Sequence, residues 1–301
     1  MKLKSLVRRL APLAALLGFG SPAVAEEAAF DRSDADPALW VVKDDDTTIY
    51  LFGTMHALKP DLVWFDDGVA TAFAESDELV LEMLEPEPAA IAPVLQKSAL
   101  AAPGRGLSKL LSTEQYVRFA VAAQRIGIAP ASLEPMQPWF AGITLAAAPL
   151  ALMGYEADKG AEKVLLAAAA QRGLKQVGLE SFEQQMGFFS SLSEADQVAF
   201  LMSGVDEMGD MDQTFARMET AWATGDTAAA AALLNEGMDD TPVLYDVLLA
   251  KRNERWAEWI DARMKQPGTV FVAVGAGHLA GDDSVQVRLA ERGLTASRVA
   301  Y

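Results

Sequence analysis

The 301-residue chain has no cysteine and only two histidines, His56 and His278. The absence of cysteine excludes disulfides, thiol nucleophiles and thiolate metal sites. Basic residues are also scarce, because 25 Lys and Arg stand against 42 Asp and Glu, which gives a formal charge of −17. A chain this acidic repels phosphate backbones, so nucleic acid is not an expected partner. Any chemistry that needs an imidazole therefore depends on these two histidines.

The sequence also lacks an apolar run long enough to span a bilayer. Its start combines basic residues within positions 2–9, an apolar stretch at 10–19 and a small-x-small site at 23–25. This pattern is typical of a cleaved secretory signal peptide, here residues 1–25. No cysteine follows the cleavage site, which excludes lipid attachment through cysteine. We therefore expect a periplasmic or secreted protein with no stable membrane anchor after signal cleavage.

Hydrophobic residues make up 51% of the chain and charged residues 22%, as in globular proteins. Short apolar, β-prone runs alternate with longer helical patterns, which predicts an α/β fold with a mixed, largely parallel sheet flanked by helices. The expected strands are 39–42, 47–52, 78–83, 175–179, 269–274 and 296–301. We expect a single domain over residues 26–301, with a helical insertion at about 86–156 and one long helix over 242–265.

Each histidine closes a Gly-x-x-His segment just after a predicted strand. His56 follows Gly53, and His278 follows Gly275. Glycine allows a sharp turn and a close backbone approach at a strand end. Side chains at the carboxyl ends of strands in open α/β sheets face the crevice where ligands bind. A lone histidine at such a place is more often a structural group, but two in the same setting favour one shared metal site.

Two glutamates end other predicted strands, Glu82 and Glu180. If the four strands are parallel neighbours, both carboxylates converge with His56 and His278. Two imidazoles with a carboxylate suit Zn, Mn, Co or Fe, and the remaining glutamate could be a general base. Either glutamate could instead be an ion-pair partner. Arg252 is interpreted as part of a solvated helix face, unless that helix lies over the sheet edge and Arg252 pairs with a carboxylate or the substrate.

Other catalytic patterns are missing from the sequence. It contains no Gly-x-Ser-x-Gly elbow, no glycine-rich phosphate loop and no His-Glu-x-x-His helix. The set of strand-end histidines and glutamates is therefore the leading candidate site.

From about Leu39 to Tyr301 the sequence resembles the TraB/GumN family, also called the TraB/PrgY/GumN or Tiki-related group. The resemblance is carried by an ordered series of motifs: Leu39-Trp40, the strand from Tyr50 to His56, Leu81-Glu82, Gly154 and Asp158, Gly178-Leu179-Glu180 with Gln184, Arg252-Asn253 with Trp256, and the segment from Val274 to Gly281.

This resemblance implies a Tiki/erythromycin-esterase/ChaN-like fold and a metal-dependent peptidase. Tiki relatives are regarded as manganese- or cobalt-dependent proteases that use residues matching His56, His278 and Glu82. The leading hypothesis is therefore an exported hydrolase acting on a peptide or other small substrate. A divalent metal (Mn, Co or Zn) would bind to His56, His278 and Glu82, with Glu82, Glu180 and Arg252 as catalytic residues.

Two alternatives to this hypothesis stay open. One is a non-catalytic periplasmic binding protein that sequesters a peptide, metal or haem. The other is an esterase-like hydrolase that uses His56 as a base without a metal. The sequence predicts no oligomeric state.

Overall fold

The computed structural model describes residues 33–238 and 242–301, and their contacts divide them into two compact units. The sheet unit comprises residues 33–84, Glu156–Leu179 and Thr214–Tyr301 apart from 239–241, and the helical unit comprises Glu85–Tyr155 and Glu180–Gln213. The predicted signal peptide, residues 1–25, lies outside the described residues. Within them, no helix is both long and apolar enough to cross a bilayer.

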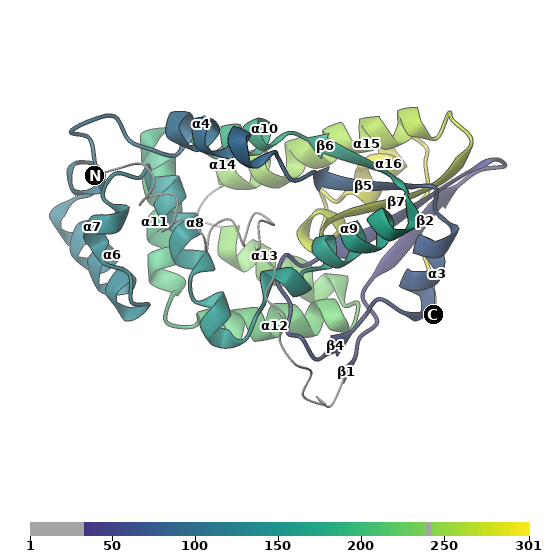
Figure 1. The fold of residues 1–301 in the computed structure, drawn as a ribbon, viewed down its shortest axis with the longest axis horizontal. Helices are drawn as coiled ribbons and strands as arrows, with labels where there is room; N and C mark the ends of the chain where they lie inside the picture. Colours follow the sequence, from purple (N-terminus) through teal and green to yellow (C-terminus); the bar gives the residue numbers. More distant parts are fainter. Residues whose placement is uncertain (1–32, 239–241) are drawn as a thin grey trace. The chain divides into compact units, whose positions relative to one another are not determined.

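Within the described residues, the main sheet has the strand order β6-β5-β7-β3-β2-β8 (Figure 1). The central β7 pairs in parallel with β3 and β5, whereas β2 is antiparallel to β3 and β8. The strands are β2 (Leu39–Lys43), β3 (Thr47–Thr54), β5 (Glu78–Met83), β6 (Lys175–Glu180), β7 (Gly268–Gly275) and β8 (Ser297–Arg298). This mixed, largely parallel sheet flanked by helices confirms the predicted fold class.

A tight hairpin joins the first two strands of this sheet. The Asp44 carboxylate accepts hydrogen bonds from the backbone N–H of Thr47 at 2.8 Å and of Asp46 at 3.2 Å. Short polar side chains of this kind stabilise turns by bonding to the backbone two or three residues on. The acidic run at 44–46 is therefore a turn, and it sets the register in which Lys43 pairs with Thr48.

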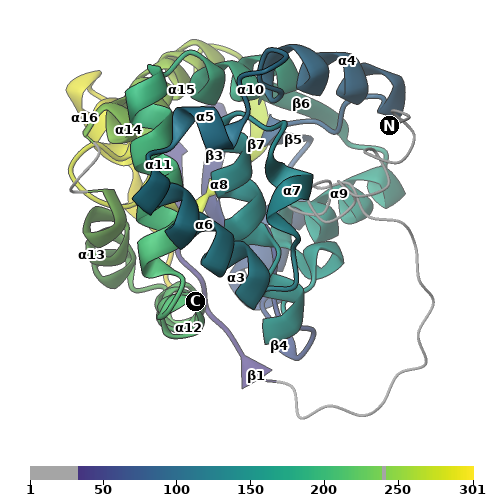
Figure 2. The ribbon, with the colours of Figure 1, turned by 90° about the vertical axis from the view of Figure 1, so that its left-hand side faces the viewer.

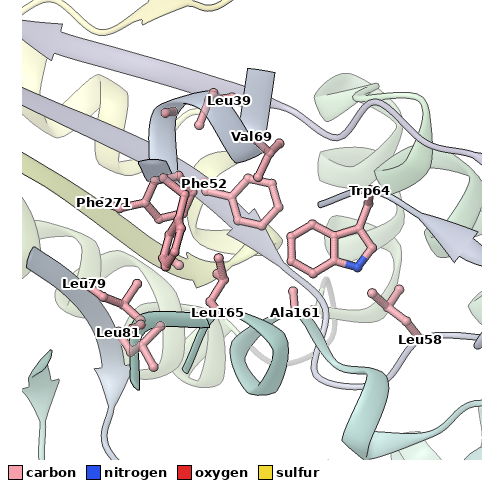
Figure 3. Packing of buried hydrophobic residues seen from close by; sticks show 14 of the residues in the cluster. Leu39, Phe52, Leu58, Trp64, Val69, Leu79, Leu81, Ala161, Leu165 and Phe271 are labelled. Atoms are coloured by element: carbon pink, nitrogen blue, oxygen red, sulfur yellow. The ribbon is translucent and has the colours of Figure 1, made fainter. Parts of the chain in front are cut away.

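The strands are apolar on both faces, and each face is covered by helices of the sheet unit. On one face, Phe52 and Phe271 pack against Val69 of α3 (Asp67–Glu75) and Leu165 of α9 (Ala161–Arg172) (Figure 3). Phe52 stacks on Trp64, with ring centroids 5.4 Å apart. Burying a large aromatic side chain contributes about 1.5–3 kcal/mol. This packing fixes α9 against the strands that bear the candidate site.

The opposite face of the sheet is covered by α15 (Lys251–Arg263) and α16 (Val285–Glu291). Trp256 and Ile260 of α15 pack on Val272 and Val274, which alternate with the residues facing α9. This alternation follows from the two-residue period of a strand. As a result α15 lies over the sheet, which is the placement that brings Arg252 to the strand ends.

The helix predicted over 242–265 is present from Pro242 to Arg263, and it contains a π-helical turn that the sequence does not predict. The segment consists of α14 (Pro242–Tyr245), a π-helical turn η3 (Asp246–Ala250) and then α15, which ends at Arg263. Single π-helical turns inside α-helices are often found at functional sites. The final strand is shorter than predicted, since only Ser297–Arg298 pairs with β2 and the Tyr301 hydroxyl donates to the Pro37 carbonyl.

Further helices, turns and strands complete the sheet unit. They are β1 (Ser33–Asp34), which pairs in parallel with β4 (Leu62–Val63), then η2 (Ala157–Lys159), α12 (Met211–Ala223), α13 (Thr227–Met238) and η4 (Ala276–Leu279). The 3₁₀ turn η4 follows β7 directly and contains His278.

The helical unit consists of packed helices joined by short loops. It contains α4 (Pro88–Ser98), α5 (Leu107–Leu110), α6 (Thr113–Arg125), α7 (Pro130–Leu133), α8 (Pro138–Ala147), η1 (Leu150–Met153), α10 (Phe182–Ser190) and α11 (Glu194–Glu207). In Figure 2, α8 and α11 lie side by side. Trp139 of α8 also stacks on Phe189 of α10, with ring centroids 5.3 Å apart. Ser193 caps α11, and its hydroxyl accepts from the N–H of Asp196.

Candidate functional site

Glu82 and His278 come together at the carboxyl ends of two paired strands. Glu82 lies near the end of β5, and His278 lies in η4 directly after β7. The nearest atoms, Glu82 Oε1 and His278 Nε2, are 3.6 Å apart. Both side chains are largely buried, with 13% and 6% of their surface exposed. The convergence expected from parallel strands is therefore present for these two residues.

The guanidinium of Arg252 contacts both members of this pair. Its Nη2 donates to Glu82 Oε2 at 2.6 Å, and its Nη1 lies 3.1 Å from His278 Nε2. Nη1 also donates to the Leu248 carbonyl at 3.1 Å, and the guanidinium lies 4.7 Å from the ring centroid of Trp256. The exception stated for Arg252 therefore applies: its helix lies over the sheet, and its side chain is only 9% exposed and pairs with a carboxylate.

A hydrogen bond at the second ring nitrogen, Nδ1, fixes the orientation of His278. Its Nδ1 lies 2.6 Å from Asn253 Oδ1, and Asn253 Nδ2 donates to the Asp283 carbonyl at 2.8 Å. Because the amide nitrogen is used as a donor, the amide oxygen must accept, so Nδ1 carries the proton. Nε2 is then the acceptor that faces Arg252. Burial, reinforced by the charge of Arg252, lowers the pKa of His278 to about 3, against the opposing pull of Glu82.

The Glu82 carboxylate is ionised despite its burial. Burial alone raises the pKa of a carboxyl group, but Arg252, His278 and His56 together outweigh it and hold the pKa of Glu82 well below its usual range. The backbone N–H of Gly275 also donates to Glu82 Oε1 at 2.7 Å. A β-carbon on Gly275 would lie 3.1 Å from that oxygen. The second Gly-x-x-His segment thus uses its glycine to bring the backbone close to the carboxylate.

His56 pairs with Glu162, which is not among the site residues that the sequence predicts. The distance from His56 Nδ1 to Glu162 Oε1 is 2.7 Å, and the Thr54 hydroxyl donates to the same oxygen at 2.5 Å. The Glu162 carboxylate raises the pKa of His56 to about 9, against the effect of desolvation. The His56 side chain is 55% exposed, so water screens part of this attraction.

Close backbone contact between β3 and α9 positions Glu162. The Ala161 N–H donates to the Met55 carbonyl at 2.9 Å. A β-carbon on Gly160 would lie only 2.1 Å from the carbonyl oxygen of His56. Glycine is therefore needed at this position, and Glu162 follows in the first turn of α9. A glutamate in the first turn of a helix is usually explained by its favourable interaction with the helix dipole. The position of Glu162 in the sequence therefore gives no reason to choose it as a histidine partner.

Glu180 ends β6 and is buried, as its position in the sequence predicts. The division between the two units falls between Leu179 and Glu180. Within the helical unit, Gln185 Nε2 donates to Glu180 Oε2 at 3.2 Å. A catalytic role for Glu180 beside the histidines stays a prediction.

The donor atoms fit a divalent cation in chemistry but not in arrangement. Metal-binding histidines usually donate their second ring N–H to an oxygen, as His56 does to Glu162 and His278 does to Asn253. Among the described residues, however, no three His, Cys, Asp or Glu side chains are placed to hold a metal ion. Instead a guanidinium cation lies against Glu82 and His278. His56, the third residue that the sequence predicts as a ligand, pairs with Glu162, and its charge helps to lower the pKa of Glu82.

Comparison with known sequences gives a match to the TraB/PrgY/gumN family over residues 38–298, a range that contains each side chain of this site. This protein belongs to the TraB/PrgY/gumN family. The chain is 24% identical over 252 residues to the uncharacterized protein YbaP of Escherichia coli (strain K12), which covers 83% of this chain and 90% of that protein. An uncharacterized Treponema pallidum (strain Nichols) protein is 22% identical over 269 residues, 84% of this chain and 80% of its own.

No solved structure matches this member of the family. The predicted relationship to Tiki/erythromycin-esterase/ChaN-like folds therefore rests on the sequence motifs. The α/β architecture itself is established by the strand order and by the helices that cover both faces of the sheet.

Proposed function

We propose that this TraB/PrgY/gumN protein is an exported, metal-dependent hydrolase of peptides, with His56, His278 and Glu82 as cation ligands. The observation that carries the proposal is the matched tethering of the two histidines. Each ring is held through Nδ1 by a side-chain oxygen, and His278 Nε2 lies 3.6 Å from the buried carboxylate of Glu82, whose pKa His56 also helps to lower. Such tethers fix the tautomer that offers Nε2 to a metal ion.

The side chains of the site differ in charge, and each charge state suits a different role in cation binding. Glu82 supplies the negative charge that a cation needs, and His278 supplies a neutral lone pair. A bound divalent cation would polarise a substrate carbonyl as a Lewis acid. Glu162 holds His56 in place through Nδ1, and a cation bound at Nε2 would replace the second ring proton and leave His56 a neutral ligand.

Export and peptide specificity come from the sequence. The signal-peptide pattern of residues 1–25 supports export, and the resemblance to Tiki-related proteins supports a peptide substrate. The rival proposal, a non-catalytic binding protein, is favoured by the contacts of Arg252, which already bonds to both Glu82 and His278. A site closed in this way could hold a ligand without turning it over.

The test is a peptide-library cleavage assay read by mass spectrometry. Untagged mature protein is incubated with Mn²⁺ or Co²⁺, with a strong chelator, and with neither. We expect cleavage that needs added metal, is abolished by the chelator and is lost in His278→Ala. The matched control is Gln286→Ala, which removes a partly buried polar side chain bonded to the Leu279 carbonyl and leaves the donors intact.

Two other results of this assay would each support a different function. Cleavage that survives the chelator supports a metal-free hydrolase with His56 as base. Intact peptide recovered in a stable complex, with no cleavage under any metal, supports the binding protein. Either result contradicts the proposed function.

A further inference from the structure

Arg252 bonds to the same atoms of His278 and Glu82 that a cation would need as ligands. A histidine nitrogen that accepts a hydrogen bond uses the same lone pair that coordinates a metal. His278 Nε2 accepts from Arg252 Nη1, and Glu82 Oε2 accepts from Arg252 Nη2. One side chain thus occupies acceptor atoms on two of the three proposed ligands. The guanidinium is itself a cation, so it satisfies the same negative charge that would attract a metal ion.

We propose that Arg252 is an internal competitor for the cation site, a built-in positive charge that keeps the metal-free site closed and sets its metal affinity. This inference rests on the proposed function, since it concerns the same three ligands. It goes further by assigning to Arg252 a role opposed to metal binding. The sequence predicts a catalytic Arg252 that pairs with a carboxylate or with the substrate, and this prediction does not extend to metal affinity.

The contacts around Arg252 show that the guanidinium is built into the protein. It lies over the Trp256 ring, and Trp256 in turn packs on His278 with ring centroids 4.3 Å apart. Arg252 and its neighbours thus form one packed group with the histidine, in which one guanidinium nitrogen bonds to Glu82 and the other to His278. The bond to the ionised carboxylate is charge-assisted and therefore strong. A surface arginine that met Glu82 by chance would show neither the burial nor the ring contact.

The backbone next to Arg252 is unusual in a way that fits this role. The π-helical turn η3 ends at Ala250, two residues before Arg252. Leu248 lies in that turn, and its carbonyl accepts from Arg252 Nη1 at 3.1 Å. The guanidinium therefore also contacts a neutral acceptor that is not one of the proposed ligands. A wide helical turn at this place is a common feature of functional sites.

The same helix offers a matched control for the test. Arg263, near the far end of α15, pairs with Glu78 near the start of β5, with Nε and Oε2 3.4 Å apart. This pair is as buried as the Arg252–Glu82 pair, with side chains 12% and 8% exposed. Arg263→Gln thus removes one buried arginine–glutamate pair between α15 and β5 and leaves the site untouched.

The experiment measures Co²⁺ affinity of the untagged mature protein by isothermal titration calorimetry and by visible absorption of the bound ion. Wild type is compared with Arg252→Lys, Arg252→Met and Arg263→Gln. Arg252→Lys keeps the charge but cannot form the two-nitrogen fork. We expect Arg252→Met to bind Co²⁺ more tightly, by roughly ten- to a hundredfold for loss of a charge-assisted bond. Arg252→Lys should gain by a smaller factor, because it loses the fork and keeps the charge. Arg263→Gln should match wild type.

The outcomes separate this inference from the proposed function. If wild type binds Co²⁺ and folded Arg252→Lys binds it no more tightly, Arg252 does not compete and the inference fails alone. If Arg252→Met does not fold, the lysine variant decides. If no variant binds Co²⁺, both the inference and the metal-dependent function fail. Circular dichroism of each metal-free variant shows that the comparison is between folded proteins.

Discussion

His278 Nδ1 lies 2.6 Å from Asn253 Oδ1, and this contact fixes which ring nitrogen faces Arg252. Replacing Asn253 with Ala leaves a buried ring N–H without its acceptor. We expect a loss of about 1–3 kcal/mol in the free energy of unfolding. ¹⁵N NMR of the histidine rings should show His278 as a mixture of tautomers. The two histidines of the chain make the assignment simple.

Asn253→Asp separates the orienting role from the electrostatic one. The carboxylate keeps an acceptor for Nδ1 but adds a negative charge beside the ring, as Glu162 does for His56. We expect a single tautomer, as in wild type, and a pKa of His278 above its wild-type value of about 3. NMR titration of the ring checks both points. An unchanged pKa would show that Asn253 is not in contact with Nδ1 in solution.

The alkaline shift of the other histidine is a second electrostatic prediction. Glu162→Gln removes the charge that most raises the pKa of His56, so this pKa should fall from about 9 toward 6.5. Glu156→Gln is the matched control, because it removes one carboxylate from the segment just before α9. NMR titration should show no shift of His56 in the control. Equal shifts in both variants would mean that overall charge, rather than the Glu162 contact, sets this pKa.

The sequence was sufficient to predict the sheet and the strand-end residues. Continuous apolar strands predicted a sheet covered on both faces, and Val272 and Phe271 do face opposite helix layers. Glu82 and His278 meet because β5 and β7 are parallel neighbours. These features depend on local periodicity and on a general rule about strand ends, so one sequence can reveal them.

The partners of the histidines could not be predicted in this way. Glu162 reaches His56 only because α9 is positioned against the end of β3, where Gly160 allows a very close backbone contact. Arg252 is buried only because α15 lies over the sheet and a π-helical turn precedes it. Such contacts depend on how distant elements pack, and residue spacing along the chain carries no direct sign of them.

The stability of the protein should fall both below and above pH 6.5, the ordinary pKa of histidine, and a different histidine is responsible on each side. The folded-state pKa of His278 is lowered to about 3 from 6.5, so below pH 6.5 the unfolded state binds a proton that the folded state does not. Stability therefore falls as the pH drops from 6.5, by at most about 1.4 kcal/mol per pH unit for one proton. Lowered pKa values of Glu82 and Glu162 add to the loss once the pH falls below 4.5.

His56 acts in the opposite direction. Its folded pKa is raised, so its contribution is complete below pH 6.5 and is lost as the pH rises toward about 9. Urea unfolding across this range should therefore show greatest stability near the ordinary histidine pKa. His278→Gln should flatten the acid side, and His56→Gln should flatten the alkaline side. A variant that moved both sides equally would contradict these separate assignments.

Two glycines give a stability prediction of opposite sign. A β-carbon at Gly160 would lie 2.1 Å from the His56 carbonyl oxygen, a backbone atom that cannot rotate away. Gly160→Ala must therefore push α9 from the end of β3, and we expect a loss of about 1–3 kcal/mol. The move also separates Glu162 from His56, so the pKa of His56 should fall toward 6.5 in the same variant.

Gly187 is the matched control for this substitution. It lies inside α10, and a β-carbon there would have no neighbour within 4 Å. Gly187→Ala should stabilise the protein by about 0.5–1 kcal/mol, because alanine loses less backbone entropy in a helix. Urea unfolding measures both changes, and NMR follows His56. If Gly160→Ala were as stable as wild type and kept the alkaline pKa, the close approach of α9 to His56 would not exist in solution.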